Sequence, residues 1–307
     1  MTMGIDGFIE YIQVERRYSE HTVRAYEQDL QEFCSFIHCN PSEWDPRMTT
    51  TEDVRLWLVS MLDAGSSPRT VRRKMSSLRS MYKYLLRIGK VQTDITRGVI
   101  APKVSKPLPV FFKEQEMSRA EEQMEWSDDF PSVRDSLAIE MLYETGMRRA
   151  ELVGLSDNDI DLLQQQVRVF GKRRKERIVP FGDRLTEMIR QYLSLRDEEF
   201  GGADTMEAGT TTGQRAFFLD NKGKPLTAAQ LYSIVRSRMG EVSSQKKHSP
   251  HVLRHTFATA MLNNGADINT IKDLLGHASL AATQVYTHTT FDQLRAAYKK
   301  AHPRASL

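Results

Sequence analysis

The stretch that decides the fold is HSPHVLRHTFATAMLNNGADINTIKDLLGHASLAATQVYTH, residues 248–288. Ser249 and Pro250 form an N-cap and first-turn pair, and apolar residues then recur at helical spacing. Asp267 can cap a second helix, which ends where Gly276 offers a left-handed residue. The stretch therefore predicts two helices in succession, with room for a short third one.

Basic, imidazole and phenolic side chains gather outside the apolar stripes of these helices. His251 and Arg254 lie three residues apart and share one face of the first helix. His277 follows the end of the second helix, and Tyr286 lies in the third, which Ser279 can begin. Such a cluster suits the attack of a phenol on a phosphodiester, because guanidinium groups stabilise the extra negative charge on the non-bridging oxygens. A tyrosine, whose free pKa is about 10, needs a base or a positive field to react at neutral pH.

Basic residues dominate another stretch, Arg69 to Lys103. It holds ten lysines and arginines against Asp94 as its single acid, although the whole chain carries a formal charge of only +3. A solvated helix normally mixes both signs, so a run of one sign favours a polyanion as partner. The candidate DNA contacts of this stretch are Arg69, Arg72, Arg73, Lys74, Arg79 and Lys83.

The 307 residues suffice for two domains. Helical periodicity over residues 1–100 predicts a small all-helical N-terminal domain. Prolines mark residues 101–110 as a linker, and residues 111–307 predict a larger C-terminal domain that begins with a helix over 112–126. Within it, residues 200–212 are small and polar, which indicates a loop.

Two alternating segments in the C-terminal domain, Gln166–Phe170 and Glu176–Pro180, predict a hairpin. Its tip is basic, with Lys172 followed by Arg173, Arg174 and Lys175. A lysine in such a field can have a lowered pKa and give up a proton, but the tip can equally serve as a contact for phosphates. The expected fold class is mainly α with a small β-hairpin or sheet in the C-terminal domain.

Several segments resemble the tyrosine site-specific recombinases of the phage integrase family. The C-terminal signature is carried by SPHVLRHTFAT, LLGH and TQVYTH, and the terminal AHPRA is similar to that of the XerC/XerD branch. TGMRRAELVGL resembles the family's first box, and SSPRTVRRKMSSLRSMYKYL resembles its core-binding domain. Departures are Thr96-Arg97, where Asn-Pro is more usual, Ala260, where His often follows FAT, and Ala281-Ala282 before TQ.

The resemblance implies a two-domain clamp around DNA and an enzyme that cuts and rejoins strands through a 3′-phosphotyrosyl link. Tyr286 would be the nucleophile and Lys172 the acid for the leaving 5′ oxygen, with no cofactor, ATP or metal. The catalytic set it implies is Arg148, Lys172, His251, Arg254, His277 and Tyr286. Arg173, Arg174 and Lys175 would contact DNA.

The same resemblance implies partners. Four protomers, identical or of two related kinds, would join two duplexes, and a division-linked DNA translocase is a possible activator. An apolar patch of Leu294, Ala297 and Tyr298 in the C-terminal tail would dock on a neighbouring protomer. The role it favours is resolution of chromosome dimers in the cytoplasm, at the nucleoid; the sequence contains no run of roughly 20 apolar residues that could span a membrane, and no signal peptide follows Met1.

The sequence leaves three other interpretations open. The chain could be the integrase of a mobile element. It could also be an architectural DNA-binding protein that keeps the fold without the chemistry. His251 and His255 have a spacing that zinc ligands use, but the charge of Arg254 between them opposes a metal, and we expect no metal site.

Overall fold

The computed structural model describes residues 4–104, 110–122, 127–171, 176–201, 215–243, 245, 247–276 and 288–305; of residues 121–122 and 288–292 it describes the backbone alone. The chain divides into two compact units, residues 1–107 and 108–307, each with its own hydrophobic core. No helix in the described ranges is long and apolar enough to cross a membrane.

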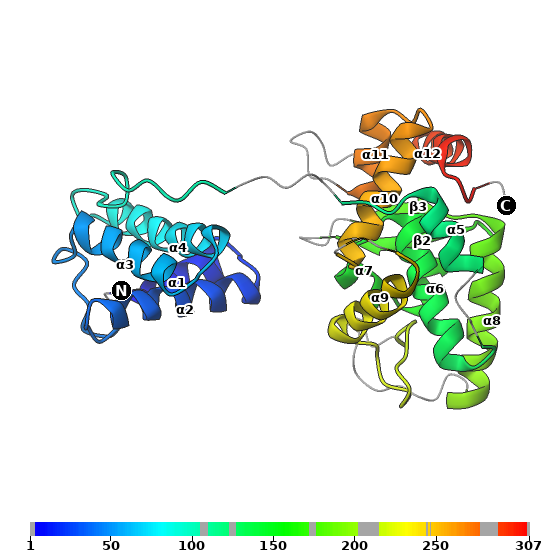
Figure 1. The fold of residues 1–307 in the computed structure, drawn as a ribbon, viewed down its shortest axis with the longest axis horizontal. Coiled ribbons are helices and arrows are strands. Elements are labelled where there is room, and N and C mark those ends of the chain that lie inside the picture. The colour runs from blue at the N-terminus through cyan, green and yellow to red at the C-terminus, as the bar shows by residue number, and fades with distance from the viewer. Residues whose placement is uncertain are drawn as a thin grey trace. The chain divides into compact units, whose positions relative to one another are not determined.

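Unit 1, residues 1–107, is helical (Figure 1, blue to cyan). Its longer helices begin where Ser19, Thr50 and Ser67 each accept a hydrogen bond from the backbone amide three residues on. Apolar and aromatic side chains from all of its helices form the core. The elements are α1 (Ile5–Glu10), the π-helical turn η1 (Tyr11–Glu15), α2 (Glu20–Phe36), α3 (Thr51–Asp63) and α4 (Pro68–Arg87).

Unit 2, residues 108–307, combines helices with one small sheet, as the sequence predicted for the C-terminal domain (Figure 1). Its elements are α5 (Glu114–Glu122), α6 (Phe130–Thr145), α7 (Arg149–Val153), the 3-10 turn η2 (Asp157–Asp159), β1 (Ile160–Asp161), β2 (Gln166–Phe170), β3 (Glu176–Pro180), α8 (Asp183–Phe200), α9 (Ala228–Val242), α10 (Pro250–Asn263), α11 (Ile268–Leu275) and α12 (His288–Ala301).

The sheet is antiparallel in the order β1-β2-β3, and Val167 pairs with Val179 in its centre. The predicted hairpin is confirmed with the predicted bounds. Alternation explains the register, because Val167, Val169 and Val179 point into the core of unit 2 while Gln166, Arg168 and Ile178 are less buried.

Helix α6 is the central element of unit 2. All of its residues except Pro131 and Ser136 are buried, and it packs against α7, α8, α9 and α10. A helix that is covered on every side belongs to the core rather than to the surface. It ends at Gly146, which takes the left-handed conformation (φ 59°). This turn leads directly into the predicted site.

Helix α5 begins later than predicted, at Glu114 instead of residue 112. The amide of Phe112 donates to the Thr256 hydroxyl of α10 (2.9 Å), and that of Lys113 donates to the Glu116 carboxylate (2.8 Å). The first amide is therefore bound to α10 and the second to the capping carboxylate, and the helix starts after them. The predicted end of this helix lies outside the described residues.

The C-terminal tail packs on its own unit. Helix α12 lies against β3, α10 and α11, and Leu294 and Tyr298 are buried in the core of unit 2. Tyr298 donates to Glu144 of α6 (3.0 Å). The predicted patch for a neighbouring protomer is therefore covered within the chain for these two residues, while Ala297 is half-buried. Docking of the tail on a neighbouring protomer stays a prediction.

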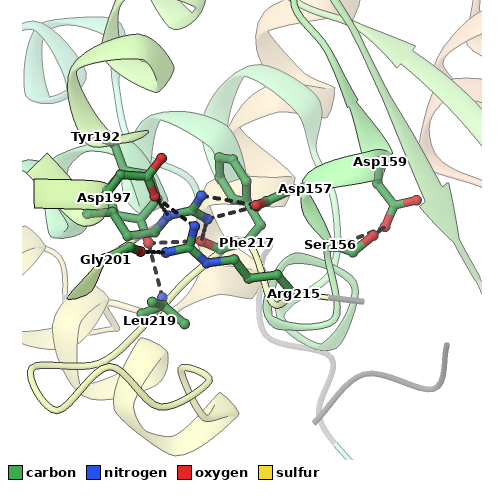
Figure 2. Close-up of polar contacts among 10 residues, drawn as sticks. Ser156, Asp157, Asp159, Tyr192, Asp197, Gly201, Arg215, Phe217 and Leu219 are labelled. Carbon is green, nitrogen blue, oxygen red and sulfur yellow. Dashed lines mark hydrogen bonds and ion pairs between the residues drawn. The ribbon is translucent and has the colours of Figure 1, made fainter. Parts of the chain in front are cut away.

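The ends of the segment 202–214, which covers most of the predicted polar loop, are held by a polar network (Figure 2). Arg215 donates to the Asp197 carboxylate (2.8 Å) and to the carbonyl of Gly201 (3.0 Å). Buried Arg196 holds both carboxylate oxygens of Asp157 (2.7 and 3.0 Å). Gly201 follows the end of α8 and Arg215 is bound to α8, so both flanks of the segment are held by that helix. Residues 202–212 of the loop lie outside the described residues.

Candidate active site

Three of the six predicted catalytic residues lie in the described part of the chain, namely Arg148, His251 and Arg254. Lys172, His277 and Tyr286 lie outside the described residues, and so do the predicted DNA contacts Arg173, Arg174 and Lys175.

Arg148 occupies the N-cap position of α7, one turn after the end of α6. Its backbone amide donates to one oxygen of Glu151 (2.8 Å) and its guanidinium to the other (2.7 Å). The turn before it is tightly enclosed, because a Cβ on Gly146 would lie 2.5 Å from the Phe257 ring of α10. The turn before Arg148 thus lies against α10, the helix that carries His251 and Arg254.

Arg254 is buried in α10 and is held by backbone carbonyls from two other segments. Its guanidinium donates to the carbonyl oxygen of Gly146 (2.6 Å) and to that of Leu275 (2.7 Å). Burial, followed by the nearby charges of Arg148 and Arg177, lowers the pKa of Arg254 to about 10. The group stays cationic at neutral pH, so a buried positive charge lies beside Arg148.

His251 lies one turn before Arg254 on α10 and is exposed. Partial burial of its ring, followed by the positive charges of Arg149 and Arg254, lowers the pKa of His251 below 6.5. The imidazole is therefore neutral at neutral pH, and one of its nitrogens can accept a proton or a hydrogen bond.

One residue of this cluster was not among the predicted site residues. Arg177 of β3 is buried, with 4% of its side chain exposed, and pairs with Glu151 through both of its terminal nitrogens (3.1 and 2.7 Å). The sequence did hold a signal, because Arg177 shares the inward face of β3 with Val179. A charged residue at an inward position of a strand requires a buried partner.

The six predicted DNA contacts of unit 1 fall into two groups. The side chains of the first group are exposed and make no polar contact with the described residues; this group is Arg69, Arg72 and Lys83. The other three are held inside the unit: Arg73 by the buried carboxylate of Asp29, Lys74 by Glu32, and Arg79 by the carbonyl of Val99. Only the first group has its full charge available to an external anion.

Two models of protein families match the chain. The model of the phage integrase family matches residues 111–293, and that of the phage integrase N-terminal SAM-like domain matches residues 5–89. The chain belongs to the phage integrase family.

Curated relatives narrow the class further. The tyrosine recombinase XerC of Chlorobaculum tepidum is 35% identical over 97% of this chain and 94% of its own length. XerC of Oceanobacillus iheyensis is 38% identical over 100% of this chain and 98% of its own length. The protein is a site-specific tyrosine recombinase of the Xer type, an enzyme that cuts and rejoins DNA by transesterification.

Solved structures support the fold. The Tn1549 transposon integrase in complex with transposon right end DNA matches with a TM-score of 0.68 and 19% identity, over 96% of this chain and 98% of that one. The XerH site-specific recombinase bound to difH substrate matches with a TM-score of 0.64 and 21% identity, over 97% and 84%. At these identities the likeness concerns the fold, and it confirms the predicted fold class.

Proposed function

We propose that Tyr286 attacks a phosphodiester while Arg148 and Arg254 hold its non-bridging oxygens. The phenol oxygen forms a bond to phosphorus, and the bond to the 5′ oxygen breaks. Lys172 gives a proton to that leaving oxygen, and the product is a 3′-phosphotyrosyl link with a free 5′ hydroxyl. The reverse attack by a 5′ hydroxyl of another strand rejoins the DNA, so the link conserves the energy of the broken bond.

One observation carries the proposal. Arg254 donates to the carbonyl of Gly146, two residues before Arg148, although the two arginines are more than a hundred positions apart in the sequence. The Arg254 guanidinium thus lies at the turn that leads into Arg148, and the charge of Arg148 is near enough to lower the pKa of Arg254. Paired guanidiniums suit a phosphate whose negative charge grows in the transition state.

The imidazoles would complete the site. A neutral His251 can accept the proton of the tyrosine or a hydrogen bond from it, because its pKa is lowered by burial and the arginines. His277, the residue after the left-handed cap of α11, would donate to the phosphate as the resemblance implies. Neither assignment needs a metal or a nucleotide.

Double-stranded DNA with a specific site is the proposed substrate, and related protomers are the proposed partners. Among the structural neighbours, a lambda integrase is a dimer bound to a core site. We propose that this chain acts in a tetramer on two duplexes, with residues 1–100 and 111–307 as the two halves of a clamp joined by residues 101–110. For the tail to dock on a neighbouring protomer, Leu294 and Tyr298 would have to leave their place in unit 2.

The proposed biological role is resolution of chromosome dimers at the nucleoid in the cytoplasm, with a division-linked translocase as possible activator. The near full-length likeness to XerC relatives supports this role over that of a mobile-element integrase. The location of the DNA site decides between them, since an integrase acts at the ends of its own element.

Trapping the covalent intermediate tests the proposal. Purified wild-type protein is incubated with nicked fragments of its own genome, the reaction is stopped with detergent, and the DNA that stays attached to protein is sequenced. We expect one discrete site for the wild type and none for Tyr286→Phe, which keeps the ring and removes the nucleophile. No attached DNA with the wild type would reject the catalytic proposal and leave an architectural role.

A further inference from the structure

The structure assigns to Arg177 the role of a positioning residue that aligns Arg148 through Glu151 and ties Arg148 to the end of α11. This inference rests on the proposed function, because it assumes that Arg148 and Arg254 bind the scissile phosphate. Arg177 itself would not touch the DNA.

The contacts of Arg177 use its whole guanidinium. Its two terminal nitrogens donate to the two oxygens of Glu151 (3.1 and 2.7 Å), and its Nε donates to the carbonyl of Leu274 (2.8 Å). With 4% of the side chain exposed, it has no surface left for a ligand. The planar fork of arginine allows such a fixed arrangement, which a lysine does not reproduce.

Glu151 passes this arrangement on to Arg148. The carboxylate that Arg177 holds also accepts from the Arg148 amide (2.8 Å) and guanidinium (2.7 Å), so backbone and side chain of Arg148 are both set. Burial would raise the pKa of Glu151, but the hydrogen bonds and charge of Arg177, with the bonds from Arg148, hold it below its usual range. The carboxylate is therefore ionised and accepts all four bonds.

The charges of the cluster explain why two arginines are needed on one carboxylate. Glu151 paired with Arg148 alone would neutralise the guanidinium that is to hold the phosphate. Arg177 adds a second positive charge, so the carboxylate is balanced and the cluster of Arg148, Arg177, Arg254 and Glu151 keeps a net positive charge. Arg148 has 38% of its side chain exposed, and it can turn that charge outward.

Arg177 also fixes the end of α11. It donates to the Leu274 carbonyl while Arg254 donates to the next one, Leu275, so two guanidiniums cap the helix terminus side by side. Gly276 follows with φ 63°, and a Cβ there would lie 3.1 Å from both Cδ and Nη1 of Arg177. His277 is the next residue in the sequence. Arg177 thus connects β3, α7 and the start of the segment that leads to His277 and Tyr286.

Stability alone does not explain such a pair. Desolvation of a buried arginine and carboxylate offsets most of their attraction, and apolar residues of similar volume often serve folding as well. The distinctive result of this pair is that three chain segments keep one relative geometry. A misplacement of about 1 Å at a reacting group can cost on the order of 100-fold in rate.

The test uses Arg177→Lys with Arg196→Lys as matched control. Arg196 is also buried in unit 2 and also holds both oxygens of a carboxylate, that of Asp157, but it has no bond to the site residues (Figure 2 shows Asp157). Single-turnover cleavage is measured on a nicked duplex that carries the site defined by wild-type trapping, together with duplex binding and Tm. A parallel duplex carries a methylphosphonate at the scissile position, which removes one anionic oxygen.

On the ordinary phosphate we expect Arg177→Lys to cleave roughly 100-fold more slowly than wild type, with duplex binding nearly unchanged. On the methylphosphonate the deficit should shrink to less than about 10-fold, because less negative charge has to be stabilised. Arg196→Lys should lower Tm about as much as Arg177→Lys does and leave cleavage of both duplexes near the wild-type rate.

Two results would overturn the inference: wild-type-like cleavage by Arg177→Lys, or an equal deficit on both duplexes, which would indicate general damage. If Arg177→Lys does not fold, the double variant Arg177→Met with Glu151→Gln removes both buried charges and should show the same preference for the methylphosphonate. Absence of cleavage by the wild type would instead reject the proposed function.

Discussion

Two arginines of unit 2 and two of α4 in unit 1 carry the same charge in opposite surroundings. Arg254 and Arg177 are buried and held by backbone carbonyls or a carboxylate, whereas Arg69 and Arg72 project from α4. A buried, oriented guanidinium acts strongly over a short range, while an exposed one is screened by salt and hydrated. The first kind suits the stabilisation of one phosphate in a transition state and the second suits attraction of a DNA backbone.

The largest difference should appear when Arg254 is changed to Lys. A lysine keeps the charge but cannot reach the carbonyls of Gly146 and Leu275 and the phosphate together. We expect cleavage of the trapped site to fall on the order of 1,000-fold with little change in duplex affinity. Single-turnover cleavage and gel-shift titration measure the two effects. Equal losses in both would mean that Arg254 acts as an ordinary DNA contact.

The turn that holds Arg254 should be the next most sensitive point. Gly146→Ala puts a Cβ 2.5 Å from Phe257 at a residue with φ 59°. We expect unit 2 to lose roughly 2–4 kcal/mol of unfolding free energy, measured by urea denaturation.

Gly65→Ala in unit 1 is the control for this change. Its φ is 80° and nothing lies within 4 Å of the added Cβ, so only the backbone strain of about 1 kcal/mol should remain. Equal losses for the two variants would show that the packing around Gly146 is looser than the structure has it.

The tail provides a test through pH. Burial, with the nearby charge of Glu140, raises the pKa of Glu144 well above 4.5, and its Oε2 accepts from Tyr298 and from the Gly182 amide. The stability that this group contributes is present below the unfolded value and is lost as pH rises through the folded value. Glu144→Gln keeps an acceptor for both bonds and removes the charge, so it should match wild type near about pH 5 and exceed it by roughly 1 kcal/mol or more near about pH 8.

Urea denaturation at several pH values measures that difference. Tyr298→Phe serves as its comparison, because it removes one hydrogen bond to Glu144 but keeps the carboxyl, so its stability should still fall as pH rises. A wild-type curve parallel to that of Glu144→Gln at all pH values would mean that the carboxyl titrates normally.

The smallest effects belong to unit 1. Arg72→Gln and Lys83→Gln should each weaken binding to a random-sequence duplex several-fold and reduce the slope of log affinity against log salt by about one. Arg73→Gln is the matched comparison, because Arg73 is already paired with buried Asp29. It should lower the unfolding free energy of unit 1 and leave the salt slope nearly unchanged. A reduced salt slope with unchanged stability would mean that Arg73 leaves Asp29 to bind DNA.

Local signals in the sequence were reliable where short-range physics decides. Asp267 caps α11 through the amides of Asn269 and Thr270, Gly276 takes the left-handed conformation, and the β2–β3 hairpin has its predicted bounds. Each depends on a few neighbouring residues. The family motifs placed the chain correctly for the same reason, because they are contiguous in the sequence.

Predictions about exposure were less reliable. Ile268 has the same apolar spacing as Ile271 and Leu274 of α11 but is 54% exposed, since it lies in the first turn beside the cap while the other two meet the core. Leu294 and Tyr298, predicted as an apolar patch for another protomer, are buried in the core of unit 2, and the docking itself stays a prediction. Periodicity shows that a face is apolar, but not which surface covers it.

By itself the sequence determined most of the helices and caps, the hairpin, the family and the candidate catalytic residues, because capping, periodicity and motifs act over a few positions. Only the tertiary structure decided that Arg254 is held by the Gly146 and Leu275 carbonyls, that Arg177 joins Glu151 and Leu274, and which arginines of α4 keep their charge for a partner. These contacts join residues up to a hundred or more positions apart, and the packing of helices and strands brings them together.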